Sequence, residues 1–291
     1  MMNRTARRST NNIRNVRKHN LIGVVKWGSM VDSDRQYGYL TPDNSKRRVA
    51  MRKGQNIAGY PVGIIYIEDV WYPLLPGNIV NGYTFDFPVR LKAVKGLDIP
   101  NLFAAGDDVL LSILDACEEL RHEGVRAISA ACGFFGNYQK QVAAAMDIPV
   151  AISSLVQLPW IATLLQPVQK IGVLTADSTS LTDKLLESCA IGSDLKSRLV
   201  VQGLQSGKEF SCILEGRGVF DNGAVEQEVV GAALEIVSAN PGIGAILLEC
   251  SDMPPYAHAV QRATGLPVFD FTTLIRWLHS AVCQKPYHGF I

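Results

Sequence analysis

The feature that most constrains the fold is an alternation that begins near residue 58. Short apolar runs rich in β-branched residues alternate with longer segments whose apolar residues recur at helical spacing. This alternation is typical of βα units, and strands that are apolar throughout are expected where helices cover both faces of a parallel sheet. Strands are predicted over 62–68, 89–95, 125–131, 148–152, 169–175, 198–202, 243–249 and 266–270, and helices over 106–123, 136–146, 179–190, 225–239, 255–264 and 271–283. We therefore predict an α/β protein.

The composition fits such a protein and excludes several others. With 291 residues, of which 47% are hydrophobic, the chain is long enough to bury a large core. The six cysteines are scattered, without a CxxC pair or a Cys/His cluster at metal-ligand spacing, so the sequence predicts neither a disulfide framework nor a zinc site. The most apolar window, 142–165, is interrupted by polar residues and prolines, and we expect no membrane span. We also expect no secretory signal and a cytoplasmic location.

Two cysteines follow predicted strands, at the edge of the sheet where ligands bind in α/β proteins. Cys132 ends the run AISAAC, and Cys250 ends the run GAILLEC. Each is followed by residues that suit a helix start: Gly133 after the first thiol, and Ser251, Asp252 and two prolines after the second. Because a helix N-terminus presents free N–H groups, we expect it to lower the pKa of each thiol.

Two thiols that face each other across a cleft can act on opposite faces of one carbon. One removes a proton as the thiolate and the other delivers a proton as the thiol, which inverts the centre. Helix N-termini directed at a substrate carboxylate would stabilise the carbanion. This chemistry needs no cofactor in principle, and the sequence contains no GxxxxGK[ST] or strand-following GxGxxG motif that would hold one.

Six ordered motifs resemble the aspartate/glutamate/hydantoin racemase superfamily, in particular a less characterised branch, the aspartate/glutamate racemase family. The motifs are GIIYIED followed by PLLPGNIVN and TFDFPV, then AISAACGFFGNYQ, PVAISSLVQLP, IGVLTA and AILLECSDMPPYAHAVQRATGLPVFD. The resemblance implies two similar α/β lobes, each a parallel sheet flanked by helices, with the active site in the cleft between them. It also implies a cofactor-independent racemase or epimerase, and so an isomerase, that is often a homo-oligomer such as a dimer. Its two cysteines would act on the carbon next to a carboxylate or a hydantoin-type carbonyl of a small amino-acid-like substrate.

Carried over by position, the resemblance assigns roles to individual residues. Cys132 and Cys250 would be the catalytic pair, with Glu68 or Asp69 as the acid beside the first thiol. The predicted substrate-binding residues are Gly133, Phe134, Ser153, Ser154, Gln157, Thr175, Ser251 and Asp252. The chain departs from typical amino-acid racemases, which have Asn-Thr after the first cysteine and Thr-His after the second. Asp252 could partly replace that histidine.

The domains predicted on this basis are a basic extension over 1–57, a first lobe over 58–153 plus 271–291, and a second lobe over 154–270. The extension holds 13 Lys and Arg against 3 Asp and Glu. It would be disordered or form a small hairpin. Its segment 23–43 faintly resembles a cold-shock domain, which would bind nucleic acid, but we do not expect nucleic acid as the partner.

Other interpretations of the same residues stay open. Glu68 and Asp69 could merely end a strand, and Ser153 and Ser154 could merely cap a helix. One cysteine could suffice, as in a decarboxylase or a cis-trans isomerase of the same fold. The chain could also be a non-catalytic binding protein whose basic extension binds nucleic acid.

Overall fold

The computed structural model describes residues 55–290, which form one compact unit. The predictions for a hairpin, a disordered arm or a nucleic-acid site within residues 1–54 lie outside the described residues. In the described part, eight strands form two separate parallel sheets, as the sequence predicts. The strands are β1 (Val62–Ile67), β2 (Val89–Val94), β3 (Ala127–Ala131), β4 (Val150–Ala151), β5 (Lys170–Thr175), β6 (Leu199–Gly203), β7 (Ile243–Leu248) and β8 (Val268–Phe269).

The two sheets have the same topology. The first has strand order β2-β1-β3-β4 and the second β6-β5-β7-β8. In each sheet the strand order reverses between two central strands, β1 and β3 in the first and β5 and β7 in the second. Ligands bind at such switch points, outside the carboxyl ends of the strands. The fold is therefore two similar α/β lobes, each with one such position.

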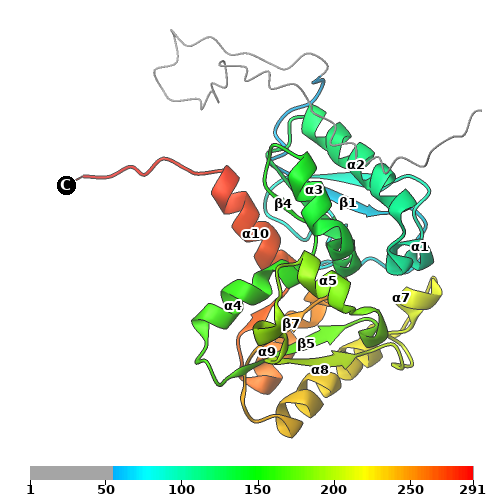
Figure 1. Cartoon of the computed structure of the whole chain (residues 1–291), viewed down its shortest axis with the longest axis vertical. Helices are drawn as coiled ribbons and strands as arrows, with labels where there is room; N and C mark the ends of the chain where they lie inside the picture. Colours follow the sequence, from blue (N-terminus) through cyan, green and yellow to red (C-terminus); the bar gives the residue numbers. More distant parts are fainter. Residues whose placement is uncertain (1–54, 291) are drawn as a thin grey trace, which may run out of the picture. The chain divides into compact units, whose positions relative to one another are not determined.

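Helices flank both sheets (Figure 1). The α-helices are α1 (Ile99–Ala104), α2 (Asp107–His122), α3 (Gln139–Ala145), α4 (Leu158–Leu164), α5 (Asp183–Ser188), α6 (Ser193–Lys196), α7 (Cys212–Glu215), α8 (Asn222–Ala239), α9 (Ala257–Thr264) and α10 (Phe271–Val282). Short 3-10 helices are η1 (Gly133–Tyr138), η2 (Ser154–Gln157), η3 (Ser178–Ser180) and η4 (Pro254–Tyr256). The helix predicted over 136–146 is thus a 3-10 turn followed by α3, and α1, α4, α6 and α7 were not predicted.

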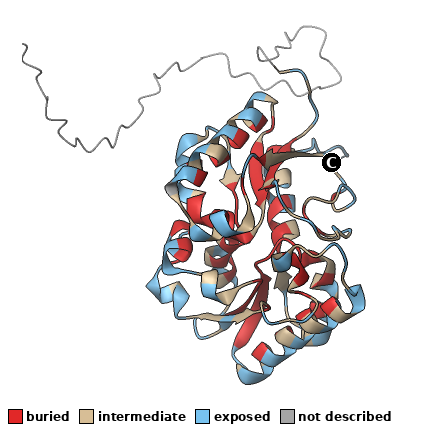
Figure 2. Ribbon diagram, turned by 90° about the vertical axis from the view of Figure 1, so that its right-hand side faces the viewer, coloured by how far each residue is buried: buried red, intermediate tan, exposed pale blue. Residues whose placement is uncertain are grey.

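The core is continuous through both lobes. Strands β1 and β7 are almost fully buried, and Figure 2 shows buried residues along the sheets of both lobes. One hydrophobic cluster joins Ile65 and Ile128 of the first sheet to Val173 and Leu247 of the second. Burial of this apolar surface stabilises the joint between the lobes as well as each lobe.

The last helix, α10, returns to the first lobe. Phe271, Leu274 and Leu278 pack against Val62 and Ile64 of β1. Its start is fixed by a capping box in which the Asp270 carboxylate accepts from the Thr273 N–H at 2.9 Å.

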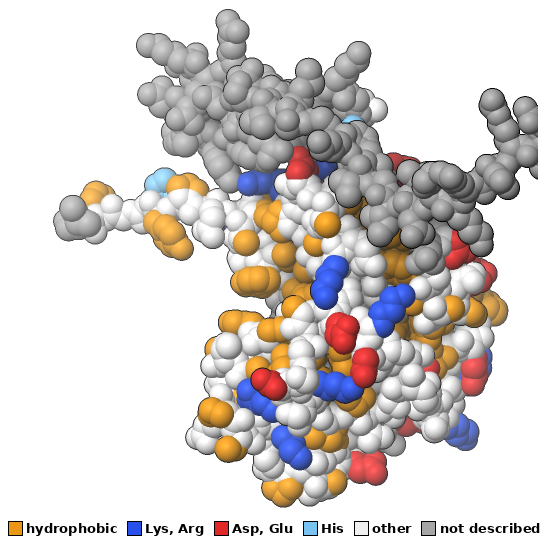
Figure 3. Space-filling model, in the orientation of Figure 1, with side chains coloured by type: hydrophobic (Ala, Val, Ile, Leu, Met, Phe, Trp, Pro, Cys, Tyr) orange, Lys and Arg blue, Asp and Glu red, His pale blue; other side chains and the backbone are white. Residues whose placement is uncertain are grey.

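Within residues 55–290, no helix is long and apolar enough to cross a bilayer. On the face drawn in Figure 3, basic and acidic side chains are interspersed.

Candidate active site

A pocket of about 560 Å³, measured with its open mouth, lies at the carboxyl ends of β1, β3 and β7. It takes residues from both lobes. Its lining consists of Tyr66, Ile67, Val70, Tyr72, Asn78, Val80, Ile99, Phe103, Ala131, Cys132, Gly133, Phe134, Ala176, Ile213, Leu214, Glu249, Cys250, Ser251 and Asp252. A lining that is mostly apolar and includes a few polar groups is typical of a site for a small molecule.

Both predicted thiols line this pocket. Cys132 follows β3 and Cys250 follows β7 by two residues, so each stands at the switch point of its own sheet. Cys132 is half-buried, whereas Cys250 is buried with 6% of its surface exposed. The structure thus brings together two residues that are 118 positions apart in the sequence.

The expectation that helix N-termini lower the pKa of both thiols is wrong. Burial raises the pKa of Cys132 well above its ordinary value, and Glu249 and then Asp252 raise it further. Burial likewise raises the pKa of Cys250, with Asp252 and then Glu249 adding to the effect. The N–H groups of Phe134 and Asp252 do act on the two sulfurs in the predicted direction, but burial and the carboxylates outweigh them. Each thiol therefore needs a nearby proton acceptor to ionise.

Asp252 is such an acceptor for Cys250. The Cys250 thiol donates to Asp252 Oδ2 at 3.5 Å, and the same oxygen accepts from the Tyr72 hydroxyl at 3.1 Å. Ser251 Oγ donates to Oδ2 at 3.4 Å, and Asn78 Nδ2 donates to Oδ1. Burial raises the pKa of Asp252 to about 6, although these four hydrogen bonds oppose the shift. Asp252 is thus a buried carboxylate whose orientation is fixed from several sides.

Glu249 is the second buried carboxylate, and it has fewer partners. Thr175 Oγ1 donates to its Oε2 at 2.8 Å, while Oε1 is buried and has no hydrogen-bond partner among the described residues. Burial raises the pKa of Glu249 to about 7, and the negative charge of Asp177 acts in the same direction. The carboxyl lies against the backbone of Gly133, where a Cβ would overlap Oε1. A glycine after Cys132 therefore makes room for the carboxyl of the opposite lobe.

The other predicted site residues fall into two groups. Gly133, Phe134, Ser251 and Asp252 line the pocket together with the two thiols. Glu68 and Asp69 do not: both side chains are exposed, and Glu68 Oε2 accepts from the Gly96 N–H at 2.7 Å.

Ser153, Ser154, Gln157 and Thr175 are buried behind the pocket and do not line it. Ser154 Oγ donates to the Glu249 carbonyl at 3.0 Å, so it and Thr175 hold Glu249 instead of a substrate. Ser153 Oγ accepts from the Leu155 N–H at 3.3 Å as the cap of η2, and Gln157 Nε2 donates to the Asp270 carbonyl at 3.0 Å.

Sequence reasoning missed Glu249, Tyr72 and Asn78. A signal for Glu249 was present, because a carboxylate directly after the apolar run GAILL sits where burial is expected. Tyr72 and Asn78 belong to the loop after β1, and only the folded chain brings them to Asp252.

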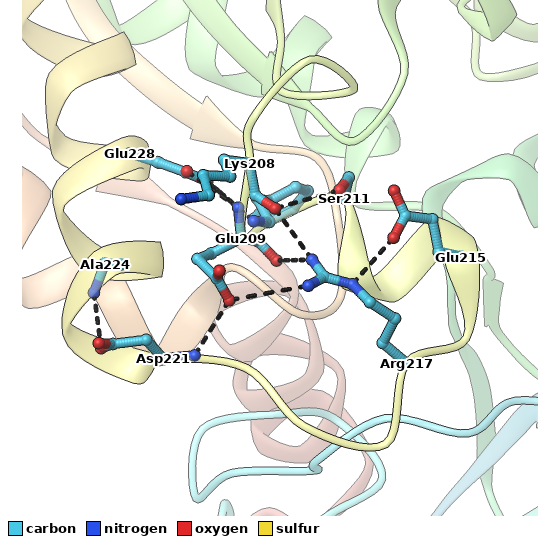
Figure 4. A network of polar contacts seen from close by, with 9 residues as sticks. Lys208, Glu209, Ser211, Glu215, Arg217, Asp221, Ala224 and Glu228 are labelled. Carbon is cyan, nitrogen blue, oxygen red and sulfur yellow. Dashed lines mark hydrogen bonds and ion pairs between the residues drawn. The ribbon is translucent and has the colours of Figure 1, made fainter.

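One wall of the pocket is α7, which contributes Ile213 and Leu214. Figure 4 shows the polar network that braces the segment around this helix. Arg217 Nη2 donates to the Lys208 carbonyl at 2.9 Å, and Glu228 of α8 accepts from the Phe210 N–H at 2.8 Å. The network anchors the segment to α8 and so fixes the wall.

The pocket lining is unusual in its charge. It contains two carboxyl groups and two thiols, and none of the described residues that line it is Lys, Arg or His. Within residues 55–290 no group of three or more His, Cys, Asp or Glu is placed to hold a metal ion.

Comparison with known proteins identifies the family. The sequence model described as Asp/Glu/Hydantoin racemase matches residues 89–278, nearly two thirds of the chain. The chain belongs to the Asp/Glu/hydantoin racemase family. It is therefore a member of a family of enzymes that act on small molecules.

Two relatives carry the name of a reaction other than racemisation. A dimethylsulfoniopropionate lyase of Durusdinium sp. clade D is 32% identical over 231 residues, covering 77% of this chain and 76% of that one. Dimethylsulfoniopropionate lyase 7 of Emiliania huxleyi is 31% identical over 274 residues, covering 90% and 77%. Allantoin racemase of Klebsiella pneumoniae shares the fold, with a TM-score of 0.54 and 17% identity over 76% of this chain and 87% of that one.

Proposed function

We propose that this chain is a lyase that acts on a small carboxylate with a leaving group on the β carbon, of the dimethylsulfoniopropionate type. The supporting observation is the hydrogen bond from the Cys250 thiol to the buried Asp252 carboxylate in the pocket. It provides one base with a built-in proton acceptor, which is what an elimination requires. The names of the two lyase relatives agree with this chemistry.

In the proposed reaction, Asp252 takes the proton of Cys250, and the Cys250 thiolate removes a proton from the carbon next to the substrate carboxylate. The electron pair of that C–H bond forms the C=C bond, and the C–S bond breaks with its electron pair on sulfur. Dimethylsulfoniopropionate thus gives dimethyl sulfide, acrylate and one proton, which leaves through Cys250 and Asp252. The sulfide departs as a neutral molecule, so no acid is needed on its side.

Proton removal builds negative charge on the substrate carboxylate, which must be stabilised. Gly133 at the start of η1 and Ser251 in the turn after β7 line the pocket, and we expect their backbone N–H groups to meet the substrate carboxylate. N–H groups held in place in a mostly apolar pocket stabilise such charge without reorganisation. They supply the positive potential that the lining lacks in its side chains.

Racemisation is the second candidate function, because Cys132 from the other lobe lines the same pocket. In that reaction one thiolate removes the Cα proton and the other thiol returns a proton to the opposite face. Both thiols are then indispensable, whereas the elimination needs one.

The test is incubation in D₂O with dimethylsulfoniopropionate and, separately, with single enantiomers of amino acids and hydantoins. Headspace gas chromatography measures dimethyl sulfide, and NMR measures acrylate and Cα–H exchange. We expect the wild type to release dimethyl sulfide and Cys250→Ser to be about a thousandfold slower. Cys132→Ser should lose less than about tenfold.

Exchange at Cα with inversion, no sulfide release, and equal loss in both serine variants would establish the racemase and reject the lyase. Full sulfide release by Cys250→Ser would reject Cys250 as the base. Circular dichroism of each variant verifies that the fold is retained.

A further inference from the structure

Among the described residues, no cationic side chain in the pocket wall pairs with its two carboxyl groups. Asp252 accepts hydrogen bonds from four side chains, so its negative charge is well solvated by the protein. Glu249 accepts one from Thr175, and its Oε1 has no partner among the described residues. The lining holds no Lys, Arg or His that could pair with it.

An ionised carboxylate in this position is costly to the fold, because its lost hydration is not replaced. The chain nevertheless makes room for it. The backbone at Gly133 has no Cβ that would displace the carboxyl, and Ser154 fixes the Glu249 carbonyl at 3.0 Å. A charge that is held in place but left uncompensated favours a ligand of opposite sign.

The rest of the lining suits an organic cation. Tyr66, Tyr72, Phe103 and Phe134 line the same pocket, and the rings of Phe103 and Phe134 pack with centroids 4.1 Å apart. Aromatic faces attract onium groups, whose charge is spread over methyl groups and is weakly hydrated. An apolar wall with an unpaired negative charge behind it matches such a group better than it matches a second carboxylate.

We propose that Glu249 is a specificity-determining residue that supplies the negative charge by which the pocket selects an onium group, sulfonium or quaternary ammonium, on its substrate. The inference names the substrate class of the lyase site proposed above and rests on that function for the location of the substrate. It predicts that dicarboxylates such as aspartate or glutamate are poor ligands.

Cation binding favours the ionised form of Glu249, so it should be accompanied by proton release. The other titratable groups that face Glu249 are Cys132 at the end of β3, Cys250 after β7, Asp177 after β5 and Cys189 after α5. Burial keeps the pKa of all three thiols raised. Glu249 has a pKa of about 7 and Asp252, in the same wall, a pKa of about 6, so at pH 7 Glu249 holds more of its proton and contributes most of the release, which the Glu249 variants test.

The experiment is calorimetric titration of the full chain with two ligands of one shape. One is 3-(trimethylammonio)propanoate, and the other is 4,4-dimethylpentanoate, in which carbon replaces the charged nitrogen. Titrations at pH 7 in phosphate and in Tris, which differ in ionisation enthalpy, give the number of protons released. We expect the wild type to bind the onium ligand about tenfold to a hundredfold more tightly and to release a fraction of a proton.

Glu249→Gln should lose both the preference and the proton release while still binding 4,4-dimethylpentanoate. Glu249→Met, which is also neutral and of similar length, provides the same readout if the glutamine variant does not fold. Glu235→Gln makes the same charge change on the exposed face of α8 and should behave like the wild type.

The inference is overturned if the wild type does not prefer the onium ligand, or if both Glu249 variants keep the preference and the proton release. These outcomes are independent of catalysis. A preference that depends on Glu249 in a protein that releases no dimethyl sulfide would support the inference and defeat the lyase. Release of dimethyl sulfide by a protein without this preference would support the lyase and overturn the inference.

Discussion

The carboxyl ends of β3 and β7 occupy equivalent places in two similar sheets, yet their chemistry differs. After β3 the chain reads Cys132-Gly133, and the first lobe supplies no carboxyl group to the pocket wall. After β7 the chain reads Glu249-Cys250-Ser251-Asp252, and this turn supplies both buried carboxyl groups of the pocket wall. The repeated topology places a thiol at the end of a strand in each lobe. Burial raises the pKa of both thiols most, and the two carboxyl groups of the second lobe raise it further.

The two thiols have different partners. Cys250 donates to a carboxylate of its own turn, held by Tyr72 and Asn78 of the first lobe. Cys132 belongs to the first lobe, and the carboxyl that acts most on it is Glu249 of the second lobe, which lies against the next residue, Gly133. We therefore expect changes at the two ends to have different consequences.

The largest effect should come from Gly133→Ala, which tests the contact between the two ends directly. The new Cβ would overlap the Glu249 carboxyl, so one of the two must move. We expect a loss of about 3 kcal/mol of unfolding free energy, measured by urea denaturation, together with loss of activity. Gly231→Ala in the exposed interior of α8 has open space around it and should be neutral or slightly stabilising. Equal stability of the two variants would mean that the lobes do not meet at Gly133.

Glu249→Gln should stabilise the protein at alkaline pH, by about 2 to 3 kcal/mol. Burial raises the pKa of Glu249 from 4.5 to about 7, so folding favours its protonated form. The contribution of Glu249 to the stability of the wild type is therefore greatest below pH 4.5 and is lost as the pH rises to 7. The glutamine variant lacks this loss.

Thermal unfolding at pH 5 and at pH 8.5 measures the effect. The advantage of Glu249→Gln should grow between these values and level off above pH 7. If the advantage is the same at both pH values, folding does not raise the pKa of Glu249, and the difference between the two ends disappears.

A smaller effect is expected from Asp252→Asn, which removes the proton acceptor of Cys250. We expect kcat for sulfide release to fall about tenfold. The Asp252 pKa is raised to about 6, and the carboxylate is the active form, so wild-type kcat should rise with pH through about 6. This limb should vanish in the variant. Ser251→Ala removes only the hydroxyl that donates to Asp252 at 3.4 Å, so kcat of this variant should still rise with pH through about 6. If that rise is absent in Ser251→Ala, the role of Asp252 is contradicted.

Much of the fold could be predicted from the sequence. All eight strands form near their predicted positions, because β-branched apolar runs such as VGIIYI are stable only when buried in a sheet. Short helices were missed. α4 and α7 have seven and four residues, too few to show a helical repeat, and their stability comes from tertiary packing.

The site was predicted less completely. Residues adjacent to the two thiols, such as Gly133 and Asp252, line the pocket, because the chain direction at the end of a strand places them there. Glu68 was expected at the first thiol and lies on the surface instead. Both Glu68 and Glu249 follow apolar strands. Only the tertiary packing decides that Glu249 is buried and that Glu68 is exposed.

The sequence pattern determined an α/β protein with parallel strands and a thiol after two of them, because periodicity and strand ends are local properties of the chain, and the family resemblance added the two lobes. The tertiary structure alone decided which carboxylate meets which thiol, and it reversed the expected direction of both thiol pKa shifts. The reason is physical: helix termini act over one turn, whereas burial and charge depend on residues brought together from distant parts of the chain.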